Sequence, residues 1–302
     1  MIIYAIIVTY NAMRRSWIER CLDSLRDSSV PVTPIVIDNG STDETRTFVP
    51  QRYPEAVWLP QEKNLGFGQA NNIGLRYALE HDTDYVLLLN QDATVEPDTL
   101  ALLLAEGDGH SLLSPLHLNG DGSDFDVNFR RFTLNATSLP QSVRECKKIK
   151  GHYPIGEVCA ACWLMPVALV REIGGFNPLF LQYGEDNNYY DRMVYHHIKS
   201  FLVPAAEMHH DRQIHGSAKA YHHQLLHRIL LTIACDISQT KMQCAKEMRW
   251  YLKQCYTKHF FKGAYIPGQF LYELIWLTAH YRLIKKSRQT ERQKGCHWIE
   301  KT

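Results

Sequence analysis

The 302-residue sequence has no long apolar run and no dominant charge of one sign. Its longest apolar stretches, residues 225–234 and 270–279, are shorter than the roughly 20 residues that cross a bilayer. No basic segment precedes the short apolar start at residues 1–8, so we expect no signal peptide and a cytoplasmic protein. The net charge of +1 gives no reason to expect a nucleic-acid partner.

Internal repeats are also absent, and the eight cysteines do not form a zinc-finger pattern. Cys159 and Cys162 make a single Cys-x-x-Cys pair, with no second pair at the required distance. A redox pair is one interpretation of this motif. Reduced thiols that partly fill the core are the favoured one.

Strand and helix patterns alternate over the first 105 residues. Runs rich in β-branched residues predict four strands, at residues 2–9, 33–37, 56–59 and 85–89. Helical periods follow them, at residues 16–28, 42–48, 68–80 and 97–105. This order predicts an α/β fold with a mostly parallel central sheet flanked by helices. Polar residues at 38–40 and 90–92 follow two of these strands directly, where such sheets bind ligands.

The second half of the chain is less regular. Residues 118–131 predict a loop or hairpin, residues 157–165 and 200–203 predict strands, and residues 166–173 and 186–194 predict helices. From about residue 222 to the end, the apolar spacing is helical.

Six segments follow one another in an order typical of one family: IIVTYN (6–11), VIDNGSTDET (36–45), NLGFGQANNIGL (64–75), LLLNQDATV (87–95), IGGFNPLFLQYGED (173–186) and HHDR (209–212). Over residues 2–215 the chain thereby resembles glycosyltransferase family 2, and within it a rhamnosyltransferase-like bacterial branch. The resemblance implies the GT-A type nucleotide-diphospho-sugar transferase fold. It also implies inverting transfer of a sugar from a donor such as dTDP-rhamnose or a UDP-sugar to a hydroxyl of a glycan or lipid-linked glycan.

On this basis we divide the chain into two parts. Residues 1–220 form the expected catalytic domain, with a nucleotide-sugar half at about 1–95 and an acceptor half at about 96–220. Residues 221–302 form a helical C-terminal extension with a basic tail.

The resemblance places the nucleotide-sugar site at strand ends and in a glycine-rich turn. Asp38 is expected to hydrogen-bond the pyrimidine base, because a carboxylate accepts from the ring N–H of uracil or thymine. The open backbone of the turn allows its N–H groups to approach phosphate oxygens. The other expected donor contacts are Thr9, Tyr10, Asn11, Asn39, Gly40, Asn64, Gly66, Gly68, Asn71, Asn90 and Gln91. Several of these residues are alternatively simple turn formers.

A divalent cation, Mg²⁺ or Mn²⁺, is expected to offset the charge on the leaving diphosphate. Asp92 is the candidate carboxylate ligand, although Asn90 occupies the first position of the usual Asp-x-Asp motif. If residues 203–210 are extended, side-chain alternation makes His210 rather than His209 the second candidate ligand. The alternative for residues 90–92 is a structural turn.

Inversion requires a base that removes the proton of the acceptor hydroxyl. By resemblance this base is Asp186, with Glu185 as its neighbour or as an acceptor ligand, whereas helix capping is the alternative role of Asp186. The acceptor side is expected to contain Trp163, Gly175, Phe176 and Tyr183, because aromatic faces stack on sugar rings. Core packing is an equal alternative for Trp163. His215 and Ser217 are expected in a loop that closes over the diphosphate.

Two other functions compete with this interpretation. A nucleotidyltransferase would need an N-terminal glycine-rich signature with a catalytic Lys or Arg, which residues 6–15 do not provide. A non-catalytic nucleotide-sugar-binding protein would be indicated by loss of Asp92 or Asp186, and both are present.

The tail at residues 282–294 contains six basic residues and one acid. Peripheral contact with the anionic inner face of a membrane is one interpretation, at about 1 kcal/mol per basic residue. The helical stripes before it alternatively pack on the catalytic domain or form a homodimer interface, and a solvated tail is the third reading.

Overall fold

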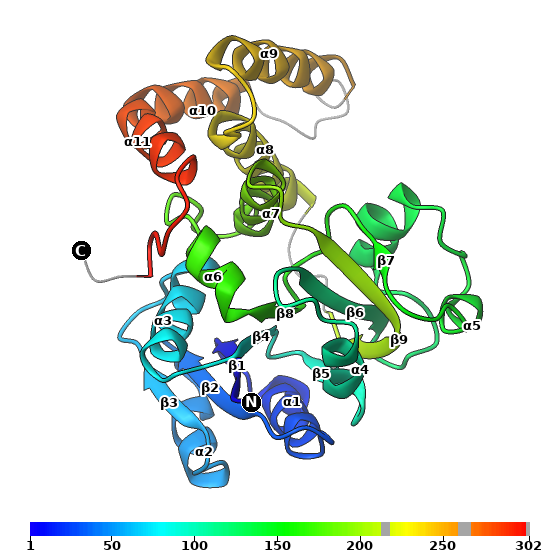
Figure 1. Ribbon diagram of the computed structural model, residues 1–302. Coiled ribbons are helices and arrows are strands. Elements are labelled where there is room, and N and C mark those ends of the chain that lie inside the picture. Colours follow the sequence, from blue (N-terminus) through cyan, green and yellow to red (C-terminus); the bar gives the residue numbers. More distant parts are fainter. Residues whose placement is uncertain (213–217, 259–266, 300–302) are drawn as a thin grey trace.

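The computed structural model describes residues 1–212, 218–258 and 267–299 (Figure 1). Within these residues, one mixed sheet has the strand order β3-β2-β1-β4-β8-β6-β9-β5, and β7 pairs with β9. The strands are β1 (Ile3–Thr9), β2 (Thr33–Asp38), β3 (Val57–Pro60), β4 (Tyr85–Leu89), β5 (Ala93–Val95), β6 (Leu112–Asn119), β7 (Tyr153–Pro154), β8 (Cys162–Pro166) and β9 (Ser200–His210).

Helices cover both faces of this sheet and continue beyond it (Figure 1). They are α1 (Trp17–Arg26), α2 (Thr45–Arg52), α3 (Phe67–Glu80), α4 (Thr99–Ala105), α5 (Val143–Cys146), α6 (Val167–Ile173), α7 (Glu185–Tyr195), α8 (Ala218–Cys235), α9 (Lys241–Lys258), α10 (Pro267–Ala279) and α11 (Tyr281–Glu291).

Two hydrophobic layers arise because side chains alternate along each strand. Ile6 of β1 packs with Leu75 of α3 on one face, and Ile7 packs with Leu22 of α1 on the other. Gly74 allows the close approach of α3, since a Cβ there would lie 2.6 Å from Cγ2 of Ile6. The strand alternation therefore fixes which helix covers which face.

The parallel arrangement is confirmed for β3, β2, β1 and β4, which pair in parallel. The second half contains antiparallel pairs, β4 with β8 and β8 with β6. Three strands were not predicted: β5 has three residues, β7 has two, and β6 contains Pro115, beside which its register with β9 shifts. The predicted strand at residues 157–165 is wrong at its start, because β8 begins at Cys162.

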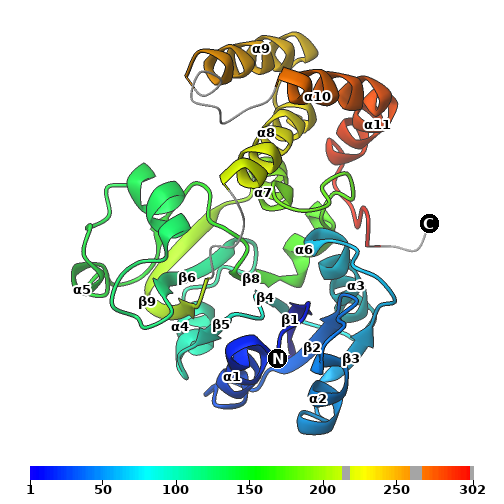
Figure 2. The same cartoon turned by 180° about the vertical axis from the view of Figure 1, so that it is seen from behind.

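The predicted helical extension is confirmed, and it forms a layer beyond α7 that is visible in Figures 1 and 2. None of the described helices combines the length and apolarity needed to cross a bilayer. The last segment returns to the α/β part, where the N–H of Gly175 donates to the carbonyl of His297 at 2.8 Å.

The basic tail is folded, largely into α11, with one of its basic side chains buried and the others exposed. Arg288 is buried in α11 and donates to the carbonyls of Ala234 and Gln239. Lys294 Nζ forms an ion pair with Glu172 at 2.5 Å. Part of the positive charge in the tail is therefore used to attach α11 to the rest of the molecule.

Candidate active site

A cavity of about 280 Å³ lies at the carboxyl ends of β1 and β4. Its lining consists of Val8, Tyr10, Asn39, Asn64, Gly66, Phe67, Asn90, Gln91, Asp92 and Gln182. Seven of these ten residues belong to the predicted donor or metal site. Val8, Phe67 and Gln182 were not predicted, although all three lie inside the segments on which the family resemblance rests.

Side-chain amides on the donor wall bind the backbone around them. Gln91 accepts from the N–H of Tyr10 at 2.8 Å and donates to the Tyr10 carbonyl at 3.3 Å. Asn39 accepts from the N–H of Leu65 at 2.8 Å, and its amide donates to Asn64 Oδ1 at 3.1 Å. These bonds hold the strand ends and the glycine-rich turn in fixed positions around the cavity.

Two glycines are required where backbone segments meet. Gly40 has a φ of +80°, and a Cβ there would lie 2.7 Å from the carbonyl carbon of Lys63. Gly66 also has a φ of +80°, and a Cβ there would lie 1.9 Å from the carbonyl oxygen of Leu181. Gly66 therefore allows the turn of the donor wall to touch the segment that leads to Glu185.

The remaining predicted donor residues lie behind the cavity lining. Asp38 is fully buried, with the N–H of Ser41 donating to Oδ1 and Arg46 Nε lying 2.9 Å from Oδ2. Asn71 donates to the carbonyl of Phe67 within its own helix. A base contact from Asp38 would require Arg46 to move, and the Arg46 side chain is 45% exposed. Thr9, Asn11 and Gly68 likewise do not belong to the cavity lining.

Asp92 lines the cavity, and the buried His210 lies directly behind it. His210 Nε2 lies 3.2 Å from Asp92 Oδ1 and 3.4 Å from Asn90 Nδ2. Burial alone would raise the pKa of the Asp92 carboxyl. The hydrogen bond with His210 and the charge of His210 outweigh that effect, so the pKa lies below its ordinary value. Asp92 therefore remains an ionised carboxylate at the cavity surface.

The predicted alternation of β9 is confirmed, because Ala206, Met208 and His210 are buried. His209 points to the other side, where its Nε2 lies 3.1 Å from Glu96 Oε1. The structure therefore selects His210 over His209 as the histidine beside Asp92.

A group of polar side chains behind His210 was not predicted from the sequence. Asp126 Oδ2 lies 3.5 Å from His210 Nδ1 and accepts a hydrogen bond from Arg212 Nε at 3.1 Å. Two backbone N–H groups, of Asn128 and Phe129, donate to Asp126 Oδ1. Burial raises the pKa of Asp126, and the charges of Arg212 and His210 more than reverse that effect. Arg212 Nη2 also lies 3.3 Å from His210 Nδ1, so Asp126 and Arg212 together surround that side of the His210 ring.

Three carboxyl groups gather at the start of α7. Burial and the charge of Asp186 raise the pKa of Glu185 to about 8, and the same two causes raise the pKa of Glu157 to about 7. Glu185 is 5% exposed, and its Oε2 has no hydrogen-bond partner in the described structure. Asn187 joins this group to the C-terminal helices, since its amide donates to Glu157 and Arg228 of α8 donates to its oxygen at 2.5 Å. Glu157 and Arg228 were not predicted, because neither residue lies in a recognisable sequence motif.

The predicted aromatic acceptor wall is wrong for two of its members. Trp163 and Phe176 are fully buried, with ring centroids 6.4 Å apart, and both contact Tyr189 in the core. Gly175 is a packing position, because a Cβ there would lie 2.3 Å from Asn72 Oδ1. Tyr183 alone is exposed, at a φ of +69° just before Gly184. His215 and Ser217 lie outside the described residues.

The Cys-x-x-Cys motif does not have the features of a redox pair. Cys162 is buried in the core, and burial raises the pKa of its thiol. Burial likewise raises the pKa of Cys159 to about 12. Reactive thiols have lowered pKa values, so the core interpretation is favoured.

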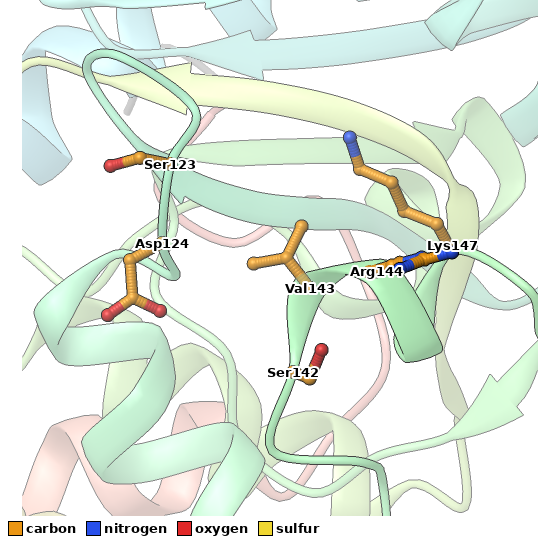
Figure 3. A pocket seen from close by; sticks show the side chains of 6 residues that line it. All are labelled: Ser123, Asp124, Ser142, Val143, Arg144 and Lys147. Atoms are coloured by element: carbon orange, nitrogen blue, oxygen red, sulfur yellow. The ribbon is translucent and has the colours of Figure 1, made fainter.

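A larger cavity, of about 510 Å³, shares no lining residue with the first (Figure 3). It lies between Ser123 and Asp124 on one side and α5 on the other, with Arg144 and Lys147 at its edge. Lys147 forms an ion pair with Glu207 at 2.6 Å. No predicted site residue lines this cavity, so we assign the chemistry to the first one.

This chain is similar in sequence to known proteins over most of its length. The family model described as glycosyl transferase family 2 matches residues 4–174. An N-acetylglucosaminyl-diphospho-decaprenol L-rhamnosyltransferase of Mycobacterium tuberculosis is 28% identical over 245 residues, which is 72% of this chain and 80% of that protein. A low-salt glycan biosynthesis hexosyltransferase of Haloferax volcanii is 25% identical over 162 residues, half of each chain.

Solved structures share the fold at low sequence identity. TarS 1-349 of S. aureus in complex with UDP aligns with a TM-score of 0.52 and 17% identity, over 87% of this chain and 74% of that chain. The mannosyltransferase PcManGT of Pyrobaculum calidifontis, in complex with GDP-Man and Mn²⁺, aligns with a TM-score of 0.56 and 17% identity, over 96% and 83%.

Proposed function

This chain belongs to glycosyltransferase family 2, and we propose that it transfers a sugar, with inversion, from a nucleotide-diphosphate donor to a hydroxyl of a lipid-linked glycan. The α/β sheet with its flanking helices is of the GT-A type, and the molecule is a nucleotide-sugar glycosyltransferase. Donor sugar, acceptor and catalytic residues are the parts of the proposal that require experiments.

One observation supports the assignment of the site above the others. A single cavity contains the strand-end residues Asn90 to Asp92 and also Gln182, from the segment that leads to Asp186. A transferase needs a donor wall and an acceptor base at opposite ends of one space, so that the hydroxyl attacks as the diphosphate leaves. The turn at Gly66 that touches Leu181 brings these two parts together.

The residues at this cavity fit a divalent cation that arrives with the donor. Among the described residues no group of three or more His, Cys, Asp and Glu side chains could hold a metal alone. Mg²⁺ and Mn²⁺ sites of nucleotide enzymes often use one or two protein ligands plus phosphate and water. We propose that Asp92 and His210 are those ligands, with the buried, unpartnered Oδ1 of Asn90 beside them. When bound, the cation would supply positive charge against the leaving diphosphate.

We propose Asp186 as the base that accepts the proton of the acceptor hydroxyl. It is partly exposed at the first turn of α7, whereas neighbouring Glu185 is buried. The raised pKa of Glu185, about 8, favours its protonated form at neutral pH, so Glu185 contributes little negative charge beside Asp186. A neutral Glu185 also leaves Asp186 as the group able to take a proton.

The donor and acceptor classes follow from the relatives. The mycobacterial relative is named for rhamnosyl transfer to a diphospho-decaprenol glycan, so we propose a lipid-linked acceptor and test dTDP-rhamnose beside UDP-sugars. The proposed division into a catalytic domain at 1–220 and a helical extension follows the end of the sheet.

A donor screen tests the proposal directly. Thermal shift and nucleotide release are measured with dTDP-rhamnose, UDP-N-acetylglucosamine, UDP-galactose and GDP-mannose, with Mn²⁺ and with EDTA. We expect one donor to stabilise the protein and to release nucleotide only when a lipid-linked acceptor is added. Stabilisation by a donor without transfer to any acceptor would favour the non-catalytic binding protein instead. Loss of inversion, read from the anomeric coupling constant of the product, would contradict the single-displacement mechanism.

A further inference from the structure

Helix α10 exposes a stripe of apolar side chains and buries two polar ones. Gln269 is 7% exposed and Glu273 is 0% exposed, so polar side chains face the protein. Leu271, Leu274 and Ile275 are 61%, 51% and 60% exposed. Their i, i+3, i+4 spacing places the three side chains on one stripe. Soluble surfaces rarely expose such a contiguous apolar stripe without a partner.

The inward face of α10 explains why the helix keeps this orientation. Glu273 Oε2 lies 2.7 Å from Nδ1 of His227 on α8, and Trp276 packs edge-on against the same imidazole at 4.6 Å. Rotating α10 to bury its leucines would break this buried pair, which is costly because a charge would lose its partner. The outward direction of the apolar stripe is therefore fixed by the fold.

The exposed charge beside the stripe is of one sign. Residues 267–291 contain two acids, Glu273 and Glu291, and both are buried. Arg282, Lys285 and Lys286 of α11 are exposed, next to the exposed Leu283. The exposed charged side chains of α10 and α11 are therefore all basic, and both helices also expose apolar side chains.

We propose that this surface, which we call the α10–α11 face (Leu271, Leu274, Ile275, Arg282, Leu283, Lys285 and Lys286), docks on an anionic lipid bilayer. Apolar side chains insert at the level of the lipid headgroups while basic side chains bind anionic headgroups, as in interfacial helices. A second copy of the chain fits less well, because a two-fold contact would bring the basic residues of one copy against those of the other.

The α10–α11 face is connected to the proposed acceptor side through buried contacts. His227 of α8 holds α10, and the adjacent Arg228 binds Asn187 on α7, one residue after Asp186. Figures 1 and 2 show α8 lying between α7 and α10 in both views. Docking would thus hold the start of α7 at a fixed position relative to the bilayer, where a lipid-linked acceptor is presented.

Sedimentation with vesicles tests this inference without any transfer reaction. The full-length protein is mixed with vesicles of phosphatidylglycerol and phosphatidylcholine in equal parts, or of phosphatidylcholine alone. We expect binding to the first vesicles, weakened by salt, and much weaker binding to the second.

Two triple variants separate the apolar and charged contributions. Leu271→Gln with Leu274→Gln and Ile275→Gln should lower the partition coefficient about tenfold or more. Arg282→Gln with Lys285→Gln and Lys286→Gln should lower it about fivefold per residue removed. The matched controls are Leu102→Gln with Val127→Gln and Phe132→Gln, and Arg144→Gln with Lys148→Gln and Lys150→Gln, which alter exposed residues elsewhere and should bind like the wild type.

Thermal melts confirm that each variant is folded before it is compared. The proposal is overturned if the wild type stays in the supernatant at low salt, or if the controls lose binding as much as the test variants. It is also overturned if sedimentation velocity shows a dimer that the apolar triple variant dissociates. Because the vesicles contain no acceptor, these outcomes are independent of whether the proposed transfer occurs.

Discussion

The donor wall and the acceptor side of the active site differ in how their polar groups are hydrogen-bonded. On the donor wall, Asn39 and Gln91 have their amides bonded to neighbouring backbone or side chains. On the acceptor side, Glu185 is buried with an unpartnered oxygen, and Glu157 has a pKa raised to about 7 by burial and by Asp186. The amides of Asn39 and Gln91 are therefore bonded, with Oδ1 of Asn90 the exception on the donor wall, whereas the acceptor side holds buried carboxyl groups at a cost in free energy.

This difference indicates a division of labour. Bonded amides keep the donor wall in one geometry before the nucleotide sugar arrives, which reduces the reorganisation needed during transfer. Buried carboxyl groups with raised pKa values are typical of sites that exchange protons. The donor wall should therefore respond to mutation mainly in binding, and the acceptor side mainly in turnover.

Asp92→Ala should have the largest effect, because Asp92 is the one carboxylate in the cavity lining. We expect transfer to fall below detection and the Mn²⁺ dependence of donor binding to disappear, measured by calorimetry with and without Mn²⁺. Asp98→Ala, an exposed acid before α4, is the matched control. Unchanged Mn²⁺ dependence in Asp92→Ala would show that the cation is held elsewhere.

Asp186→Asn should lower turnover about 100-fold or more, the range of a lost general base, and leave donor affinity nearly intact. Asparagine keeps the shape of the side chain and cannot accept the proton. Turnover is measured at saturating donor, with Asp191→Asn on the same helix as the control. Near wild-type turnover in Asp186→Asn would remove it from the mechanism.

The donor wall was largely predictable because its residues belong to short patterns in the sequence. Asn39, Gly40 and Asp92 lie within three residues of the end of a buried strand, and the ends of parallel strands meet at one edge of a sheet. The inward direction of His210 was predictable for a similar reason, since alternation in an extended strand depends on sequence position alone.

The acceptor side was not predictable in the same way. Trp163 and Phe176 are buried because they pack against each other and against Tyr189 of α7, which no local pattern reveals. Asp126 joins His210 from 84 positions away, and Arg228 reaches Asn187 from a different helix. Such contacts are long-range and carry no periodicity, so only the folded structure identifies them.

Asn39→Ala sharpens the comparison from the donor side, with a smaller effect. It removes the bonds to Leu65 N–H, Asn64 and the Gly66 carbonyl, at about 1–3 kcal/mol for partners left buried. We expect donor affinity to fall about tenfold as the turn loosens, with turnover at saturation little changed. Isothermal titration beside Asn135→Ala, an exposed control, measures this. A loss confined to turnover would contradict the proposed division of labour.

Glu185→Gln should have the smallest effect on turnover at neutral pH, because Glu185 is protonated there and glutamine resembles the neutral acid. The effect expected of Glu185→Gln is a change in how the stability of the folded protein depends on pH. Burial and Asp186 raise the pKa of Glu185 from 4.5 in the unfolded chain to about 8 in the folded protein. Between these values the folded protein holds a proton that the unfolded chain has released, so wild-type stability falls as pH rises.

The variant has no such proton, so its melting temperature relative to the wild type should rise between pH 5 and pH 8 and then level off. Turnover should also depend on the ionisation of Glu185. An ionised Glu185 would place a second negative charge beside Asp186, the proposed base. We therefore expect wild-type turnover to decline above about pH 8, and the variant to keep its turnover there. Melting curves and initial rates from pH 5.5 to 9 test both expectations, with Glu44→Gln as the exposed control. Parallel melting profiles for the wild type and Glu185→Gln would mean that the acceptor side does not bury a protonated carboxyl, and the contrast between the two walls would not hold.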